Sequence, residues 1–562
     1  MLNKLLITFV ASFIGFFTGI GQEQTKYTIQ KNITCQNAAV VSAHPLASQE
    51  GIAILKQGGN AVDAAIAMQL VLSVVYPQAG NIGGGGFMVA HLKNGKNIAI
   101  DFREKAPIRA GRDMYLDAKG EPVKLLSEDG QLSAGIPGTI AGLFAALKYA
   151  RLPFEKLIEP AIRLAENGFA ITDRQARSLD SVSKKMIQNN SLPVAFVKDK
   201  PWVGGDILVQ KELANTLKRI RDQGQKGFYE GETARLIIAE MARGKGIISL
   251  EDLKNYTAVE RTAMEFDYKK YHVITMPLPS SGGIILQQML KMIEEKNAGA
   301  MKFHTAASVQ LMIEIERRAF ADRGEFLGDP DFVKVPVKTL VSAPYLKEKM
   351  KDFESGKAGN SKTTKPGIIH ESEETTHFSI IDNQGNAVSV TTTLNDSYGS
   401  KTVVAGAGFI LNDEMDDFSI KPGVPNMYGA IGNEKNAIAP GKRMLSSMTP
   451  TIVLKNNKPF IVVGTPGGTT IPTCVFQSLV NIIDFGMDAN DAVNKPKFHH
   501  QWTPDTVYIE KDFPVDVKDQ LLKMGYNIKL RDQIGRTELI LTKKRTITAV
   551  GDKRGDDDAR GY

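Results

Sequence analysis

A threonine at the start of a strand-like segment is the first candidate for chemistry. Thr375 follows a polar run, residues 355–374, which has little apolar periodicity. Residues 377–381 and 387–393 have the composition of strands, and the residues between them are typical of a turn. The pattern predicts a β-hairpin that begins at a hydroxyl-bearing residue.

The hairpin would bring a second hydroxyl to Thr375. If the turn centres near Gln384, Thr375 lies beside Thr393 or Leu394 on the partner strand. Ordinary hairpins far outnumber catalytic threonines, so this segment alone does not identify a nucleophile. The rest of the chain has to supply the other groups that such chemistry needs.

Charged side chains follow two other predicted strands. Arg103 comes at the end of strand 97–102, where a guanidinium can hold a carboxylate through two hydrogen bonds. A predicted strand at 408–411 leads into the acidic stretch 412–418, which could bind a cation or a substrate ammonium. The alternatives are a surface ion pair for the arginine and a solvated acidic turn.

Two further segments offer hydrogen-bond donors. Ser446 and Ser447 are adjacent hydroxyls. Gly467 and Gly468 lie between a predicted hairpin and a predicted helix, residues 469–485. Backbone N–H groups beside a helix N-terminus can stabilise an oxyanion, although a tight turn would explain the glycines equally well.

Other motifs point to structure. The glycines of residues 80–86 allow a close backbone approach, but no Lys-Ser/Thr pair follows them, so they do not form a phosphate loop. His499 and His500 would face opposite sides of a strand, which favours structural histidines over a metal site. We expect no metal and no cofactor.

The N-terminus has the pattern of an export signal. Lys4 precedes an apolar run, residues 5–17, and small residues follow before a polar segment. We therefore expect a signal peptide over residues 1–21 and an exported protein, periplasmic or secreted. The run is short for a membrane span, and an uncleaved anchor is the alternative.

Composition and charge narrow the classes of function that the chain could have. The chain has 562 residues and a formal net charge of +7, with its basic residues dispersed among acids. It therefore has no nucleic-acid footprint. Cys35 and Cys474 are its two cysteines, and two unrelated buried thiols are favoured over a disulfide.

Periodicity predicts a mixed α/β chain. Capping residues Asn60 and Asp63 indicate a helix over residues 61–75. Other helices are expected near residues 45–57, 137–149, 154–167, 173–187, 211–222, 230–242, 282–295 and 305–323. Further strands are expected at residues 38–42, 87–92, 272–276, 450–454, 460–463, 507–509 and 538–541.

Taken in order, these motifs resemble the γ-glutamyltranspeptidase family from about Ala38 to the C-terminus. Each motif is weak alone, and the whole series is specific. The matching segments are residues 58–65, 80–87, 101–104, 279–283, 375–377, 412–418, 445–448, 465–468, 498–502 and 561–562.

The resemblance implies an N-terminal-nucleophile fold, a four-layer αββα sandwich formed from a self-cleaved precursor. The implied scissile bond joins Glu374 to Thr375. Residues 22–374 would form a large chain and residues 375–562 a small one, held together as a heterodimer.

The resemblance also implies roles for single residues. Thr375 is the nucleophile, with its own α-amine as base, and Thr393 positions it. Gly467 and Gly468 donate to the oxyanion. The substrate's α-carboxylate is assigned to Arg103, Ser446 and Ser447, its α-ammonium to Asp417, Asn395 and Glu414, and a lid to the loop that contains Tyr428.

The implied activity is cleavage of γ-glutamyl amides such as glutathione through an acyl-enzyme, with transfer to water or to amino acid or peptide acceptors. The sequence departs from the family's usual pattern at three positions, Glu414, Thr465 and Met444, and none of these changes removes a catalytic group. A glutaryl-type acylase and a secreted non-catalytic binding protein on the same scaffold are the alternatives. Preference between hydrolysis and transfer is left open.

Overall fold

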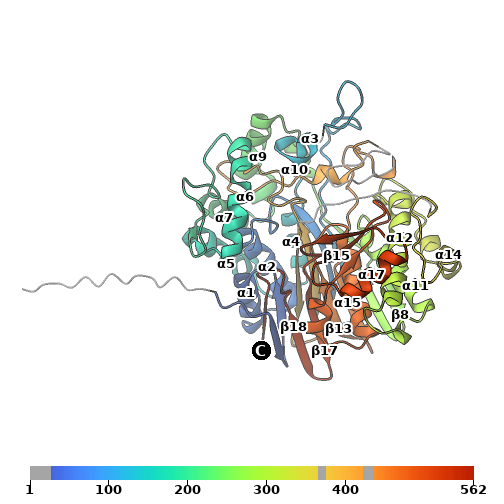
Figure 1. Cartoon of the computed structure of the whole chain (residues 1–562). Coiled ribbons are helices and arrows are strands. Elements are labelled where there is room, and N and C mark those ends of the chain that lie inside the picture. Colours follow the sequence, from blue (N-terminus) through green and yellow to red (C-terminus); the bar gives the residue numbers. More distant parts are fainter. Residues whose placement is uncertain (1–26, 124, 365–374, 422–433) are drawn as a thin grey trace, which may run out of the picture.

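Two antiparallel sheets lie face to face at the centre of the molecule (Figure 1). The computed structural model describes residues 27–123, 125–364, 375–421 and 434–562. From edge to edge, one sheet contains β19 (Asp558–Gly561), β2 (Ala39–Ser42), β10 (Thr375–Ile381), β11 (Ala387–Thr393), β3 (Gly85–His91), β4 (Asn97–Asp101) and β7 (Val259–Arg261). The other contains β1 (Asn32–Cys35), β18 (Thr546–Val550), β17 (Glu538–Lys543), β13 (Lys458–Gly464), β12 (Thr451–Lys455), β9 (Tyr271–Thr275) and β8 (Met264–Tyr268).

Helices cover the outer face of each sheet, so the expected four-layer αββα arrangement is confirmed. The β10 sheet is covered by α1 (Pro45–Lys56), α2 (Ala61–Val75), α4 (Thr139–Leu147), α5 (Phe154–Asn167), α6 (Asp173–Asn189), α7 (Lys211–Gln223), α8 (Lys226–Tyr229), α9 (Gly231–Gly244) and α10 (Leu250–Asn255). The β13 sheet is covered by α11 (Gly282–Glu295), α12 (Ala306–Phe326), α13 (Val337–Leu340), α14 (Ala343–Lys349), α15 (Thr470–Ile483), α16 (Ala489–Asn494) and α17 (Val515–Lys523).

Small elements complete the chain. A short helix α3 (Leu125–Glu128) precedes α4, and two minor sheets contain β5 (Phe169–Ala170) with β6 (Ile207–Leu208), and β14 (Phe498–His499) with β15 (Val507–Glu510) and β16 (Ile528–Arg531).

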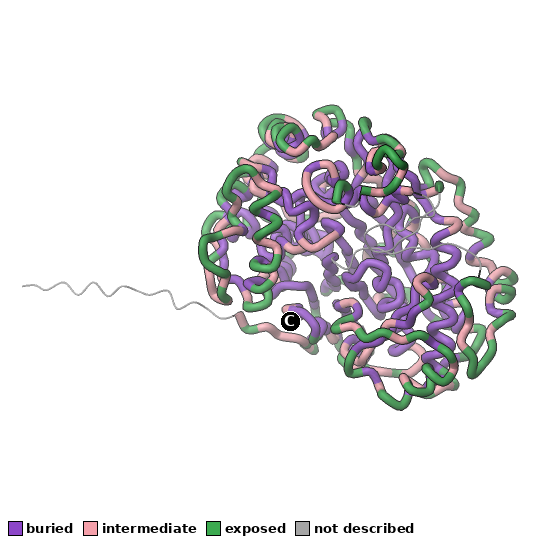
Figure 2. Tube along the Cα trace, turned by 45° about the horizontal axis from the view of Figure 1, so that its top comes forward, coloured by how far each residue is buried: buried purple, intermediate pink, exposed green. Residues whose placement is uncertain are grey.

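Apolar side chains fill the spaces between the layers. Val41 and Val89 from one sheet meet Ile452 and Ile540 from the other in the central core. Figure 2 shows the buried segments running through the middle of the molecule, with exposed segments on the outer helices and loops. Burial of this apolar surface is the main force that holds the sheets and helices together.

Local signals set the first long helix as predicted. The Asn60 side chain accepts hydrogen bonds from Val62 N and Asp63 N at 2.8 and 3.0 Å, and Asp63 Oδ2 accepts from Asn60 N at 2.7 Å. This capping box starts α2 at the expected residue. Every residue of α2 is buried, because the helix lies between the β10 sheet and the outer helices α1 and α5.

One expected strand is wrong. Residues 408–411 form no strand, and Ile410 makes only an isolated bridge with Val403. Phe409 and Ile410 are buried in the core beside the β10 sheet, so their apolar character reflects burial in a loop.

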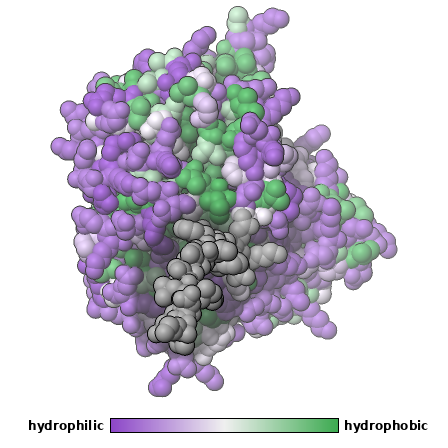
Figure 3. Space-filling model, turned by 90° about the vertical axis from the view of Figure 1, so that its left-hand side faces the viewer, coloured by the Kyte–Doolittle hydropathy of each residue, from purple (hydrophilic) through white to green (hydrophobic). Residues whose placement is uncertain are grey.

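The surface is mainly polar on the face that Figure 3 shows, where hydrophilic residues surround a central group of hydrophobic ones. Across the described part of the chain, no helix is both long and apolar enough to cross a membrane. Cys35 and Cys474 are buried free thiols, as predicted.

Candidate active site

The predicted hairpin is present and brings the two threonines together. Thr375 opens β10 and is the register partner of Thr393 at the end of β11. The Asp382 carboxylate closes the turn by accepting from Gln384 N and Asn386 N, both at 2.9 Å. Thr375 is 4% exposed, so a nucleophile here would react in a largely dry environment.

The glycine-rich run packs against the strand that carries Thr393. A Cβ on Gly84 would lie 2.2 Å from Thr393 O, and one on Gly86 would lie 2.4 Å from Thr391 O. Asn81 Nδ2 donates to Thr393 O at 2.8 Å, and Thr393 Oγ1 accepts from Asn395 N at 2.8 Å. The glycines therefore allow the close backbone approach that the sequence indicated.

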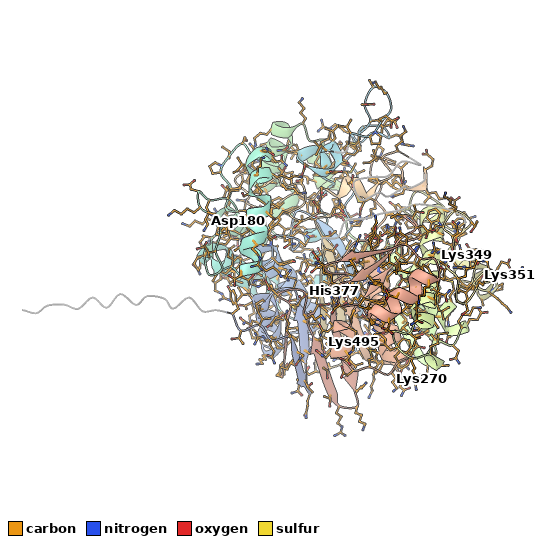
Figure 4. The ribbon with its side chains drawn as sticks, viewed as in Figure 1. Asp180, Lys270, Lys349, Lys351, His377 and Lys495 are labelled. Atoms are coloured by element: carbon orange, nitrogen blue, oxygen red, sulfur yellow. The ribbon has the colours of Figure 1, made fainter. Side chains whose placement is uncertain are left out.

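Side chains beside Thr375 lie at the centre of the molecule. His377, two residues along β10, lies there between the sheets (Figure 4). Its ring hydrogen-bonds Thr391 at 2.9 Å and Ser379 at 3.0 Å, and burial lowers its pKa to about 3. His377 is therefore neutral at ordinary pH and braces the hairpin.

Arg103 and the acidic stretch, which the resemblance assigns to opposite ends of a substrate, pair directly with each other. Arg103 leaves the end of β4, is buried, and pairs with both Glu414 and Asp417. These two acids lie on a 3₁₀ turn, Glu414–Asp417. The guanidinium also donates to Met444 O at 3.4 Å and Leu445 O at 3.3 Å, which ties it to the chain just before the serine pair.

Burial and charge shape the protonation of this group. Burial lowers the pKa of Arg103, but the carboxylates of Glu414 and Asp417 outweigh that effect and raise it above its ordinary value. Burial raises the pKa of Glu414 well above its usual range and that of Glu104 to about 8. Glu104 Oε2 lies 3.6 Å from Arg103 Nη1.

The turn before α11 holds the backbone of the serine pair. Ser281 Oγ donates to Ser446 O at 2.6 Å, and Ser281 N donates to the same oxygen at 2.7 Å. Arg323, on α12, donates to Ser281 Oγ at 2.7 Å. The turn before α11 therefore fixes the backbone of Ser446.

The two threonines, Arg103, its two acidic partners and the serine pair line one cavity of about 220 Å³. Its wall consists of Arg103, Thr375, Thr393, Asn395, Glu414, Asp417, Ser446, Ser447, Met448, Gly468 and Ile471. Within the described ranges, Asp417 Oδ1, Glu414 Oε2 and Ser447 Oγ are buried without a hydrogen-bond partner. A cationic or hydrogen-bonding ligand would satisfy them, because buried polar atoms rarely stay unpaired.

The glycine pair stands at the turn before α15. Gly467 and Gly468 have φ angles of 131° and 54°, and a Cβ on Gly467 would lie 2.3 Å from Thr470 Oγ1. Gly468 lines the cavity above, and Gly467 lines a second cavity on the other side of Thr375. The pair is therefore next to the candidate nucleophile.

Two predicted site residues fall outside the described ranges, namely Glu374 before the scissile bond and Tyr428 in the expected lid. In the described part of the chain, no group of His, Cys, Asp or Glu could hold a metal ion. His499 bonds Thr473 at 2.9 Å and Gln501 at 2.8 Å, and His500 lies 3.2 Å from Asp505, which fits structural histidines.

Sequence reasoning missed some residues. Glu104 follows Arg103 directly, so its position was visible, but nothing marked it as buried beside the guanidinium. Arg323 and the two arginines of the second cavity, Arg531 and Arg536, carried no motif, because their neighbours in space are distant in sequence.

Comparisons with known proteins identify the family to which this chain is similar. The family described as Gamma-glutamyltranspeptidase matches residues 47–562. A glutathione hydrolase proenzyme from Escherichia coli strain K12 is 44% identical over 94% of this chain and 93% of its own.

Two solved structures are also similar. Cephalosporin acylase from Bacillus halodurans has a TM-score of 0.83 at 26% identity, covering 96% of this chain and 98% of its own. A γ-glutamyltranspeptidase chain from Helicobacter pylori has a TM-score of 0.57 at 43% identity, covering 61% of this chain and 97% of its own.

Proposed function

Because the chain belongs to the γ-glutamyltranspeptidase family, we propose that it cleaves the γ-glutamyl amide bond of glutathione and related compounds. The glutamyl group passes to Thr375 and then to water or to an amino acid or peptide acceptor. The observation that carries this proposal is a single cavity whose wall contains both the Arg103–Asp417 ion pair and Thr375.

The ion pair suits a zwitterionic glutamyl end. The substrate's α-carboxylate would bind Arg103, and its α-ammonium would bind Asp417. Asp417 Oδ1 has no hydrogen-bond partner among the described residues. Charge-assisted contacts of this kind are strong in a buried site. Asn395 and Glu414 complete the ammonium side, while Ser446 and Ser447 complete the carboxylate side. Both ends lie remote from the reacting γ-carbonyl and orient it.

The nucleophile needs a base, and its own α-amine can serve after cleavage. A free α-amine has a pKa of about 7.7–8.0, close to working pH. It takes the Thr375 hydroxyl proton as Oγ attacks the γ-carbonyl, and the N–H groups of Gly467 and Gly468 stabilise the oxyanion. The C–N bond then breaks and the proton goes to the leaving amine. Thr393 holds the hydroxyl in place.

The same hydroxyl would first cut its own chain. Attack of Thr375 Oγ on the carbonyl of Glu374 forms an ester and breaks the Glu374–Thr375 amide bond, which frees the α-amine. Water then hydrolyses the ester. The products are residues 22–374, after loss of the 1–21 signal on export, and residues 375–562. Each of the two sheets contains strands from both products, which supports a heterodimer that stays together after the cut. The mechanism has no step that requires a metal or cofactor.

An acylase that acts on glutaryl side chains is the second candidate, since the cephalosporin acylase shares the fold. A glutaryl group has no α-ammonium, so it would leave Asp417 Oδ1 without a hydrogen-bond partner among the described residues. Comparing hydrolysis of γ-glutamyl and glutaryl anilides decides between them. We expect kcat/KM to favour the γ-glutamyl anilide by about tenfold or more. Equal rates would contradict the assignment, and the lack of an acyl-enzyme burst with either would favour a binding protein.

A further inference from the structure

A second cavity opens on the other side of Thr375. It measures about 420 Å³, compared with about 220 Å³ for the first. Its wall consists of Thr375, Pro466, Gly467, Thr470, Arg531, Gln533, Gly535 and Arg536. Thr375 is the one described residue that lines both cavities, and the glycine pair lies between them.

Arg536 gives this cavity a buried positive charge. The residue is 7% exposed, and Nη1 donates to Tyr76 Oη at 2.8 Å, while Nε lies 3.0 Å from Asp557 Oδ1. Nη2 is buried and has no hydrogen-bond partner among the described residues. A buried donor without a partner is costly, so the group is suited to a ligand that accepts a hydrogen bond.

The same arginine is tied to the glycine turn. Arg536 N donates to Thr465 Oγ1 at 2.7 Å, directly before Pro466 and Gly467. Gly535 packs close by, since a Cβ on Gly467 would lie 3.3 Å from Gly535 Cα. The backbone of Arg536 is therefore fixed relative to the candidate oxyanion donors, and Tyr76 and Asp557 hold its guanidinium.

A second guanidinium and an amide extend the site toward solvent. Arg531 ends β16 and stacks over the Tyr508 ring at 4.1 Å, and Gln533 is exposed. The wall contains no described aspartate or glutamate. It therefore favours an anion, in contrast to the first cavity, whose wall carries both signs of charge.

We propose that this second cavity binds the carboxylate of the amine partner in the reaction, that is, the leaving peptide and the incoming amino acid or peptide acceptor. The inference rests on the proposed function. The leaving amine departs from one side of the acyl carbonyl, and by microscopic reversibility the acceptor amine arrives from that side. An acceptor's neutral amine forms the new C–N bond, the Thr375 Oγ–C bond breaks, and the amine proton returns to Thr375 Oγ.

The test compares two acceptors on the processed, full-length enzyme. With a γ-glutamyl anilide as donor, transfer to glycylglycine is measured against transfer to glycylglycinamide, which lacks the carboxylate. We expect the native enzyme to prefer glycylglycine by about tenfold. Equal transfer to both would overturn the inference without any variant being needed.

Substitutions of the two arginines test which side chain produces the preference for glycylglycine. Arg536→Gln should bring the ratio close to one, and Arg531→Gln, at a half-exposed position, should lower it about threefold. Because the ratio is read within one protein, any loss common to both acceptors cancels. Arg545→Gln is the matched control, since Arg545 is exposed in the turn between β17 and β18 and should keep the native ratio.

Other outcomes separate the possible failures. An Arg536→Gln protein that cleaves its precursor slowly but keeps the native ratio would overturn the inference and assign the cavity to processing. If Arg536→Gln does not fold, an unchanged ratio in Arg531→Gln overturns the inference. An enzyme that cleaves no γ-glutamyl anilide would instead refute the proposed function.

Discussion

The two cavities beside Thr375 differ in the charges that their walls carry. In the first, Arg103 is buried against Glu414 and Asp417, so opposite charges already compensate each other. In the second, Arg536 is also paired, with Asp557 outside the wall, but Arg531 and Arg536 line a larger space whose wall contains no described acid. Buried charges need partners, and a compensated pair fits a ligand that itself carries both signs.

The difference suggests a division of selectivity. A paired site recognises a fixed zwitterion with defined geometry, whereas a cationic wall that reaches solvent tolerates many molecules as long as each has a carboxylate. An enzyme with one donor group and many acceptors needs this asymmetry.

The largest expected effect comes from the residue that both cavities share. Thr375→Ala should remain one uncut chain, because no hydroxyl is left to attack the preceding carbonyl, and γ-glutamyl anilide hydrolysis should fall by about 10³ or more. Intact mass spectrometry and the anilide assay measure both effects. Thr376→Val, at a buried neighbour of equal size, should still be cut. Two chains from Thr375→Ala would refute self-processing at this residue.

A smaller effect should separate the first cavity from the second. Asp417→Asn keeps the volume but removes the charge for the substrate ammonium, so kcat/KM for γ-glutamyl substrates should fall about 10- to 100-fold. Arg103→Gln should act similarly through the carboxylate. Steady-state kinetics measure this loss, and the preference for glycylglycine over its amide should persist. Unchanged kinetics in both variants would remove the proposed anchoring.

The smallest effect concerns pH and stability. Burial raises the pKa of Glu104 from its usual 4.5 to about 8, so between these values the native state holds a proton that the unfolded chain releases. This contribution to stability is complete below pH 4.5 and is lost as pH rises toward 8. The free energy of unfolding of the native protein should therefore fall by on the order of a few kcal/mol over this pH range, and in Glu104→Gln this fall should be absent.

Urea unfolding at pH 5 and pH 8 tests this expectation. Glu251→Gln, at an exposed position of α10, controls for the loss of one carboxylate elsewhere. An identical pH dependence in Glu104→Gln and the native protein would show that Glu104 is ionised in the fold, and the first cavity would then carry one more negative charge.

Local features were predictable because nearby residues determine them. The capping pair Asn60 and Asp63 fixed the start of α2, and the turn near Gln384 fixed the register that pairs Thr375 with Thr393. Helix α5 also has the predicted bounds. The prediction failed at residues 408–411, where an apolar run lies in a buried loop, because hydrophobicity indicates burial and does not by itself specify a strand.

The sequence by itself determined the hairpin around Thr375, the alternation of helices and strands, and, through its resemblance, the family. Only the tertiary structure decided which charges meet. Arg103 and Asp417 are 314 residues apart, and Arg536 and Tyr76 are 460 apart, yet each pair is in contact. Such contacts depend on how the layers pack, since no local preference brings distant segments together. For this reason the residues of the first cavity could be assigned from the sequence only through the family resemblance, and the charged wall of the second could be identified only in the folded chain.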